Sequence, residues 1–277
     1  MIQLSIIIPH YNSPETLEVL LQSIPDIPEI EVLVIDDNSN LKLNVYSRCK
    51  RKFAERNISF YENAIESKGA GGARNIGLQY ASGKWLLFAD ADDYFVENFW
   101  SKIQRYLNDE SEIIYFSPVS VKLGTSVASD RHEYYMNLVK EYCKKGDHES
   151  ELKLRYTYWS PCSKMIRKEL VDDNCIRFDG TLHSNDMLFS TKVGFYAKKI
   201  KAVDEVIYCI TESEDSLTSQ KDEKALAIRK MVFASYYFFM QRRLSTRDMK
   251  ILGYGIKDFI YFTIYMIRMK FGNKGIA

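Results

Sequence analysis

The sequence predicts an α/β protein built on a doubly wound, mostly parallel sheet flanked by helices, with a helical appendage at its C-terminal end. Continuous apolar runs recur in the first half of the chain, at Leu4–Ile8, Val32–Ile35 and Trp85–Ala89. Such runs are typical of strands buried on both faces. Helical patterns separate them, and strands that alternate with helices form parallel sheets with right-handed crossovers.

Each further element has its own signal. Pro14 stands at a helix start, and the spacing of Leu17, Leu20 and Leu21 marks one helical face. The other elements of the first half are a basic amphipathic helix over residues 42–56, a strand at Ile58–Tyr61, a helix after the glycines at 69–72, a helix with Phe99, Ile103 and Leu107 on one side, and a strand at Glu112–Phe116. Beyond residue 120 we expect helices at Tyr134–Lys145, Ser163–Asp173 and Asn185–Lys198, a strand at Val203–Ile210, and tail helices at Ala225–Arg243 and Gly255–Phe271.

Composition and charge divide the chain into a body and a tail. The 277 residues are 46% apolar and 27% charged, which is an ordinary globular composition and excludes a disordered or collagenous chain. A net charge of +1 argues against a nucleic-acid binder. However, residues 224–277 carry +9 and residues 1–223 carry −8. We therefore predict a body at 1–223, with halves at 1–120 and 121–223, and a basic helical tail at 224–277.

The cysteines and apolar segments indicate the compartment. Five scattered cysteines without a C-x-x-C pair argue against a disulfide framework or a zinc site and favour a reducing cytosol. The N-terminus lacks the charged and small-residue features of a signal peptide. The longest apolar run near the C-terminus, Phe259–Ile267, is too short to cross about 30 Å of hydrocarbon. We expect a cytoplasmic protein, either free or bound peripherally to the inner face of the plasma membrane.

The clearest chemical signal is Asp90-Ala91-Asp92-Asp93 at the end of a predicted strand. Residues i and i+2 of an extended segment point the same way, so Asp90 and Asp92 can face one ligand. Clustered carboxylates need a compensating cation, and Mn²⁺ or Mg²⁺ is the natural partner because both prefer oxygen ligands. The alternative is that Asp92 or Asp93 caps the next helix.

Two other segments point to a nucleotide. Asp36 and Asp37 follow the second predicted strand, where a carboxylate can accept the imide N–H of uracil or thymine, although plain turn chemistry is equally compatible. The segment Gly69–Gly77 places glycines before a helix N-terminus, where backbone N–H groups can approach an anion. It departs from the dinucleotide fingerprint because Arg74 occupies the sixth position, and a simple helix start is the alternative.

In the second half, Asp186 precedes an apolar helix, which makes it a candidate for catalysis or merely a helix cap. Trp159 can be a ligand platform or a core residue, and the same holds for His10 at the end of the first strand.

The order of these segments resembles the inverting family 2 glycosyltransferases of the GT-A fold. The resemblance rests on Ser5–Asn12 (SIIIPHYN), Val32–Ser39 (VLVIDDNS), Gly71–Gly77 (GGARNIG) and Phe88–Asp93 (FADADD). It weakens after residue 125 but continues through Trp159–Lys164 and Asn185-Asp186.

The resemblance implies a site for a nucleotide-sugar donor, usually a UDP-sugar, in the sheet half. By analogy the donor-binding residues are Pro9, Tyr11, Asp36, Asp37, Arg74, Asn75, Asp90 and Ala91. Asp92 is then the metal-facing carboxylate, with Asp93 in support. The family's general base lies in a Glu-Asp pair, which here reads Asn185-Asp186, so the resemblance assigns the base to Asp186. The implied acceptor-binding residues are Trp159, His183 and Asn185.

The implied reaction is the transfer of one sugar to a hydroxyl of a glycan or a polyprenyl-diphosphate-linked acceptor in surface polysaccharide synthesis. A processive synthase is not indicated, because Gln241-Arg242-Arg243-Leu244 lacks the Arg-Trp pair of that class. Two other functions stay open. A nucleotide-sugar-forming nucleotidyltransferase needs a glycine-rich loop where this chain has His10–Ser13, and a non-catalytic binding protein is disfavoured by the joint presence of Asp92 and Asp186.

The basic tail suggests where the acceptor is met. Lys257, Arg268, Lys270 and Lys274 flank the apolar run Phe259–Ile267, a pattern that favours an anionic membrane interface. The alternative is that the tail helices pack on the body or on a second subunit of a homodimer.

Overall fold

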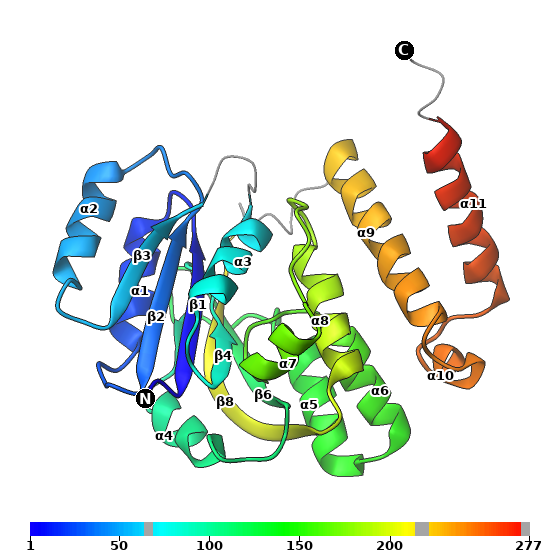
Figure 1. Cartoon of the computed structure of the whole chain (residues 1–277), viewed down its shortest axis with the longest axis horizontal. Helices are drawn as coiled ribbons and strands as arrows, with labels where there is room; N and C mark the ends of the chain where they lie inside the picture. The colour runs from blue at the N-terminus through cyan, green and yellow to red at the C-terminus, as the bar shows by residue number, and fades with distance from the viewer. Residues whose placement is uncertain (64–68, 214–221, 273–277) are drawn as a thin grey trace.

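The computed structural model describes residues 1–63, 69–213 and 222–272 (Figure 1). Its centre is a sheet with the strand order β3-β2-β1-β4-β7-β6-β8-β5. The strands are β1 (Leu4–His10), β2 (Ile30–Asp36), β3 (Ile58–Glu62), β4 (Trp85–Phe88), β5 (Tyr94–Phe95), β6 (Ile113–Lys122), β7 (Lys164–Arg167) and β8 (Ile200–Glu212).

The first half of the sheet is parallel, as predicted. Strand β1 pairs with β2 and with β4, and β2 pairs with β3. All residues of β1 and β4 are buried, which is why their apolar runs are unbroken. Because these strands run the same way, the residues that follow them meet at one edge of the sheet.

The second half of the sheet is mixed. Strand β7 is antiparallel to both β4 and β6, β6 and β8 are parallel with a shift of register, and β5 is antiparallel to β8. The predicted helix at Ser163–Asp173 is therefore wrong in its first part. Ser163 has a positive φ of 58°, and Met165 and Ile166 are buried between two strands, so tertiary packing overrides the local helical pattern.

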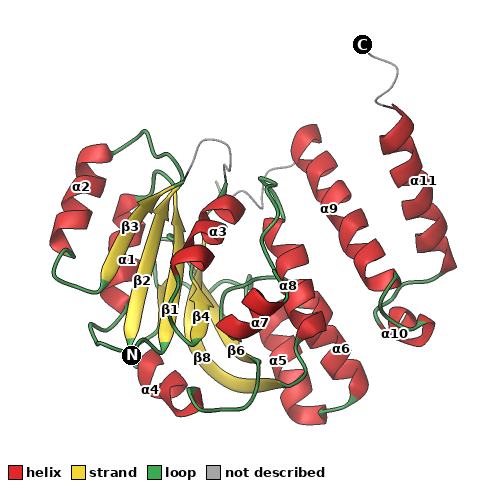
Figure 2. Cartoon of the chain, in the orientation of Figure 1, coloured by secondary structure: helices red, strands yellow, loops and turns green. Residues whose placement is uncertain are grey.

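The helices lie on both faces of the sheet and beyond it (Figure 2). They are α1 (Pro14–Ser23), α2 (Leu43–Lys52), α3 (Ala70–Tyr80), α4 (Phe99–Ile103), α5 (Glu133–Lys145), α6 (His148–Thr157), α7 (Lys168–Asp173), α8 (Asn185–Tyr196), α9 (Glu223–Gln241), α10 (Thr246–Ile251) and α11 (Ile256–Gly272). Helix α2 is shorter than predicted, the helix after residue 99 ends in a 3₁₀ turn, and α6 and α10 were not predicted.

Helix α3 packs closely on the parallel strands, on the face opposite α1 (Figure 1). A Cβ at Gly77 would collide with the side chain of Ile7 on β1. This glycine brings the start of α3 close to the edge where the strands end, and the candidate site lies at that edge.

A second apolar cluster joins the tail to the body. Residues of α9, α10 and α11 pack against residues of α6 and α8. On α8 these include Met187 and Leu188, which directly follow Asp186. The hydroxyl of Tyr236 on α9 donates a 3.0 Å hydrogen bond to the carbonyl of Tyr156. The packing of the tail thus reaches the segment that carries the predicted base.

Within the described part of the chain, every helix is too short or too polar to span a membrane.

Candidate active site

The predicted donor residues gather where β1, β2 and β4 end. His10 is paired with Asp36 in the sheet register, and the amide of Ala89 donates to the carbonyl of Ile7 on β1. The acidic segments after β2 and after β4 therefore flank the end of β1. The two segments differ in how their carboxylates are bonded.

Asp36 is a buried and fully bonded carboxylate. It accepts hydrogen bonds from His10 Nδ1 at 2.7 Å, from the hydroxyl of Ser39 at 2.6 Å and from the Ser39 amide at 3.0 Å. Burial alone would raise its pKa, but the bonds from His10 and Ser39 outweigh burial and lower the pKa below its ordinary value. Asp36 thus holds the loop after β2 as an anion.

Asp37 connects three segments of the chain. Its carboxylate accepts from the Asn63 side chain at 2.6 Å and from the amide of Gly69, the residue before α3, at 2.7 Å. Beside this loop the ring of Tyr11 is exposed, whereas Pro9 is buried in β1. Of the predicted base-binding residues, Tyr11 thus offers an exposed aromatic ring beside the fixed carboxylate of Asp37, whereas Pro9 and Asp36 are buried.

Arg74 bonds both halves of the site. From α3 its Nη2 donates to Oδ1 of Asp90 at 2.5 Å, and its Nη1 donates to Oδ1 of Asn185 on α8 at 3.0 Å. The guanidinium lies 5.3 Å from the ring centre of Phe178. Burial disfavours the charged form of Arg74, but Asp90 and Asp186 keep its pKa raised. Arg74 therefore joins the end of β4 to the start of α8 as a cation.

Asn75, the next predicted donor residue, is bonded to the chain itself. Its side-chain amide donates to the Phe178 carbonyl at 3.0 Å and accepts from the Phe178 amide at 2.8 Å. A Cβ at the neighbouring Gly71 would collide with the carbonyl of Asp179. These contacts hold α3 against the loop that leads into α8.

Asp92 and Asp93 have opposite surroundings. Asp93 is buried and accepts from the hydroxyl of Tyr208 at 2.8 Å and from the amide of Thr211 at 2.7 Å. The Asp92 carboxylate accepts no hydrogen bond from another described residue. Burial together with the charge of Asp90 raises its pKa to about 6, although the charges of Arg131 and Arg74 act in the opposite direction. Neither residue caps α4, because Asn98 occupies that position.

The donor set after β4 fits a divalent cation completed by a substrate. Asp92 is an unbonded carboxylate, and the side chain of Asp90 is 41% exposed with one oxygen bonded to Arg74. Over residues 1–63, 69–213 and 222–272, three or more His, Cys, Asp or Glu side chains do not gather into a metal site. Mg²⁺ is commonly held by one or two carboxylates together with phosphate oxygens, and this arrangement matches that case.

Asp186 is the second residue of α8, since Ser184 occupies the N-cap position, so the alternative of a helix cap is wrong. Asp186 is half-buried, and its carboxylate makes no side-chain hydrogen bond to a described residue. Burial raises its pKa, and the nearby charge of Arg74 opposes that rise only in part. The side chain is therefore a carboxylate with an increased affinity for a proton.

Lys164 is a neighbour of Asp186 that was not among the predicted site residues. It is buried, its Nζ donates to the Tyr158 carbonyl at 2.5 Å, and it lies 4.4 Å from the Tyr158 ring centre. Burial lowers its pKa to about 7, while Asp186 acts in the opposite direction. Two signals in the sequence point to Lys164: it ends the segment Trp159–Lys164, through which the family resemblance continues, and it directly precedes the apolar pair Met165-Ile166.

The predicted acceptor residues lie around the start of α8. Trp159 donates its indole N–H to the Tyr156 carbonyl at 2.8 Å and packs edge-on against Phe233 and Tyr236 of α9. His183 is buried, and its carbonyl accepts from the hydroxyl of Thr181. Trp159 thus has a packing role, and Asn185 is bonded to Arg74.

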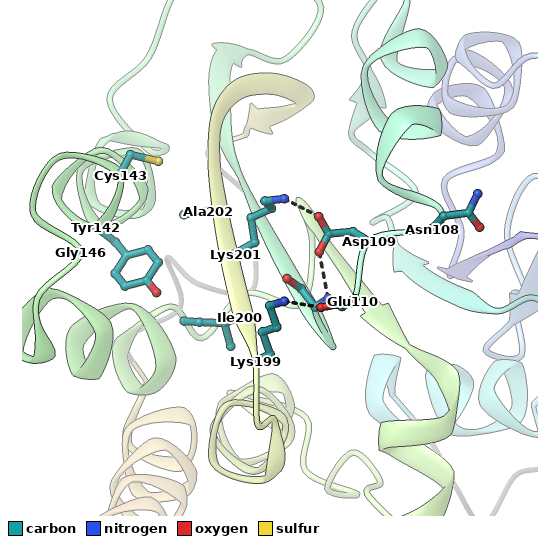
Figure 3. Close-up of a pocket in the computed structure, with 11 residues that line it drawn as sticks. Asn108, Asp109, Glu110, Tyr142, Cys143, Gly146, Lys199, Ile200, Lys201 and Ala202 are labelled. Atoms are coloured by element: carbon teal, nitrogen blue, oxygen red, sulfur yellow. Dashed lines mark hydrogen bonds and ion pairs between the residues drawn. The ribbon is translucent and has the colours of Figure 1, made fainter.

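A pocket of about 550 Å³ lies elsewhere, at the amino ends of β6 and β8 (Figure 3). Its cations are paired, Lys199 with Glu110 and Lys201 with Asp109. Since β6 runs parallel to β4, this pocket is at the opposite edge of the sheet from Asp92. None of the predicted site residues lines it, so it is separate from the candidate site.

Comparison with curated proteins gives relatives that act on sugars. The chain is 28% identical over 221 residues to the poly(ribitol-phosphate) β-N-acetylglucosaminyltransferase TarS of Staphylococcus aureus, covering 77% of this chain and 36% of TarS. It is 33% identical over 204 residues to a poly(ribitol-phosphate) β-glucosyltransferase of Bacillus spizizenii, covering 72% of this chain and 30% of the relative. It is 26% identical to a Campylobacter jejuni GalNAc(5)-diNAcBac-PP-undecaprenol β-1,3-glucosyltransferase, over 67% of this chain and 58% of that protein. The chain thus spans less than two thirds of each of these relatives.

Solved structures share the fold. The crystal structure of S. aureus TarS 1-349 in complex with UDP-GlcNAc matches with a TM-score of 0.66 and 22% identity, over 91% of this chain and 70% of that one. A mannosyltransferase from Pyrobaculum calidifontis in complex with GDP-Man and Mn²⁺ matches with a TM-score of 0.60 and 18% identity, over 90% of this chain and 67% of that one. The predicted GT-A fold is confirmed.

The family model described as glycosyl transferase family 2 matches residues 5–174, which include the acidic segments after β2 and β4. The chain belongs to glycosyl transferase family 2.

Proposed function

We propose that this protein is a metal-dependent inverting glycosyltransferase that moves one sugar from a nucleotide-sugar, most simply a UDP-sugar, to an acceptor hydroxyl. The observation that carries the proposal is the pair of carboxylates without side-chain hydrogen bonds, Asp92 after β4 and Asp186 at the start of α8. Arg74 links their neighbours, because it bonds both Asp90 and Asn185. A donor-side carboxylate and a candidate base therefore face one site.

In the proposed reaction Asp186 accepts the proton of the acceptor hydroxyl. The acceptor oxygen forms a bond to the anomeric carbon as the bond from that carbon to the diphosphate oxygen breaks, so the configuration inverts and a nucleoside diphosphate leaves. The raised pKa of Asp186 suits this role, since a carboxylate with a higher proton affinity is a better base. Mn²⁺ or Mg²⁺, when bound, would neutralise charge on the departing diphosphate.

The chain's own residues would position the two substrates. Asp92 and Asp90 would hold the metal–diphosphate end of the donor, with Asp93 and Ala91 shaping the turn. Asp37 and the exposed ring of Tyr11 would contact the base. Arg74 would hold Asp90 and Asn185 in place, so that the anomeric carbon and the acceptor hydroxyl lie in line. Such positioning contributes a large part of the rate in a single displacement.

The relatives suggest which substrates to test first. Their names specify N-acetylglucosaminyl and glucosyl transfer, to poly(ribitol-phosphate) or to an undecaprenol-linked glycan. We therefore propose UDP-GlcNAc and UDP-glucose as first donors, and a glycan or lipid-linked glycan of a surface polysaccharide as the acceptor class. We also propose a cytoplasmic location at the inner membrane face. Residues 1–223 would form the catalytic unit, and residues 224–277 would form an appendage that packs on it.

Thermal-shift titration with a panel of nucleotide-sugars, each with Mn²⁺ and with EDTA, tests the donor side. A ligand present at 100 times its Kd stabilises the folded state by about 2.7 kcal/mol. We expect one UDP-sugar to raise the melting temperature only when Mn²⁺ is present, and the same sugar to be transferred to an acceptor of the proposed class. Stabilisation that persists fully in EDTA would contradict the metal-dependent proposal.

A further inference from the structure

Helix α11 exposes an apolar stripe along its length. Ile256, Ile260, Ile264 and Ile267 are 79%, 52%, 46% and 51% exposed. Their spacing of four, four and three residues places them on one face of the helix. Phe259, Tyr261, Met266 and Met269 are also exposed on this helix. Isolated exposed apolar residues are ordinary, but a continuous stripe of this kind marks an interaction surface.

The opposite side of α11 is already used. Phe262 is buried in the cluster with α9, and Tyr265 packs partly against the same cluster. From α9, the ammonium group of Lys230 lies 5.0 Å from the ring centre of Tyr261 and 4.8 Å from that of Tyr265. Helix α11 lies at the outer edge of the molecule, beyond α9 (Figure 1). No described residue outside α11 is seen to cover the stripe.

The basic side chains near the stripe favour an anionic partner. Lys257 and Arg268 are exposed near its two ends. The two acidic residues of the tail are both engaged, since Asp248 bonds His148 and Ser245 and Asp258 accepts from the Gly255 amide. Of the other predicted cations, Lys274 lies outside the described residues, and the side chain of Lys270 is not described.

A tail of charge +9 favours an anionic partner and disfavours a second copy of itself. The length of α11 is consistent with a helix that lies in an interface. Its 17 residues extend about 25 Å, less than the roughly 30 Å hydrocarbon thickness of a bilayer. Interfacial helices of this type bury their apolar face at the boundary between headgroups and acyl chains, with Lys and Arg toward anionic lipids.

We propose that α11 docks this protein on an anionic membrane surface, with Ile256, Ile260, Ile264 and Ile267 entering the lipid and Lys257 and Arg268 facing the headgroups. A role in reaching a lipid-linked acceptor rests on the proposed function. The membrane contact itself is measured without donor or acceptor, so it and the proposed transfer reaction can fail separately.

Vesicle flotation of the full chain tests this contact. We would compare vesicles of phosphatidylcholine alone with vesicles containing about 30% phosphatidylglycerol, at low and at high salt. The stripe variant I260S/I264S should bind anionic vesicles roughly tenfold more weakly or worse, because it removes two apolar side chains that the proposal places in the lipid. The matched control is V19S/L43S, which removes two comparably exposed apolar residues on α1 and α2. The charge variant K257E/R268E should also bind more weakly, and circular dichroism melts check that each variant folds.

Binding of the unaltered protein to anionic vesicles, weakened by salt and by both tail variants but not by V19S/L43S, supports the proposal. It is overturned if the protein stays with neither vesicle, binds neutral vesicles equally, or binds equally after I260S/I264S. It is also overturned if sedimentation velocity shows a dimer that I260S/I264S dissociates while vesicles are not bound, since the stripe then belongs to a second copy.

Discussion

The acidic segment at the end of β2 (Asp36-Asp37) and the acidic segment after β4 (Asp90–Asp93) lie at the same edge of the sheet, yet Asp36 and Asp92 are in opposite states. After β2, the protein bonds both carboxylates, and the pKa of Asp36 is lowered. After β4, Asp92 has no side-chain hydrogen bond among the described residues, and its pKa is raised to about 6. Both carboxylates of the first segment are bonded within the protein, whereas in the second Asp92 is only partly compensated, by the charges of Arg131 and Arg74.

The difference separates structural carboxylates from carboxylates that await a partner. An acid whose hydrogen bonds lower its pKa stabilises the fold at neutral pH, while a partly buried acid with a raised pKa destabilises it until a cation or proton arrives. Asp186 and Asp92 share a raised pKa and the absence of a side-chain hydrogen bond to another described residue. Asp93 is bonded as Asp36 is, but its pKa is raised because it is buried beside Asp92 and Asp90. The state of each acid therefore depends on its bonds and its burial together, and not on its place in the motif alone.

The largest expected effect is at Asp186. The variant D186N keeps the size of the side chain but removes the proposed base, so transfer should fall about 10²–10⁴-fold. Donor binding, measured by thermal shift with Mn²⁺, should be unchanged. D173N, an exposed acid at the end of α7, is the matched control and should leave kcat intact. Wild-type turnover in D186N would remove Asp186 from the mechanism.

The variant D92N should change stability and function in opposite directions. A pKa raised from 3.8 to about 6 corresponds to about 2–3 kcal/mol of destabilisation at pH 7, which the neutral amide relieves. In EDTA, D92N should therefore unfold at higher urea concentration than the parent protein. The same variant should lose the Mn²⁺-dependent part of donor binding. A less stable D92N in EDTA would show that the acid after β4 is bonded after all.

In the same urea experiment, the variant D36N should change the free energy of unfolding in the opposite direction to D92N. It weakens charge-assisted bonds from His10 and Ser39 in a buried position, so we expect a loss of about 1–2 kcal/mol. Because this loop is held by several bonds, the donor affinity should change less than in D92N. If D36N and D92N destabilise the fold equally, the proposed difference between a bonded Asp36 and an unbonded Asp92 is wrong.

The smallest expected effect is on the pH dependence of stability. For Asp92 the folded-state pKa lies above the unfolded value, so this residue makes the metal-free protein lose stability as pH rises from about 4 to about 6. Asp36 acts in the other sense, since its lowered pKa gives stability that is lost only in acid. In urea melts over this range, we expect the slopes of unfolding free energy against pH for the parent and D92N to differ by about 1 kcal/mol per pH unit. Identical slopes would assign another pKa to Asp92.

The sequence predicted the parallel half of the fold well because its strands are buried on both faces. The runs at Leu4–Ile8 and Trp85–Ala89 have no other stable place in a small protein. Strand β7 was missed because Lys164–Arg167 has a charged residue at each end and continues into a true helix. Helix α6 was missed because its residues are largely charged, and only packing against α8 and the tail reveals its buried face.

The sequence could identify the residues of the candidate site, but not the hydrogen bonds that connect their side chains. Acids after strands and glycines before a helix follow from local chemistry. The partners that distinguish the acids come from far along the chain, as Asn63 does for Asp37 and Tyr208 for Asp93. The bond between Arg74 and Asn185 is also distant in sequence. Those pairings depend on tertiary structure, so sequence patterns cannot tell a bonded acid from an unbonded one.

The double contact of Arg74 has a thermodynamic consequence. One guanidinium is shared between Asp90, on the proposed donor side, and Asn185, which precedes the proposed base Asp186. We expect a nucleotide that alters the Asp90–Arg74 pair to alter the Arg74–Asn185 pair as well, so that occupancy of one subsite changes the affinity of the other. Linkage requires the effect to be reciprocal, and couplings of this kind are typically about 1–3 kcal/mol. The two substrates of this protein are thus expected to bind as mutually dependent ligands, not as independent ones.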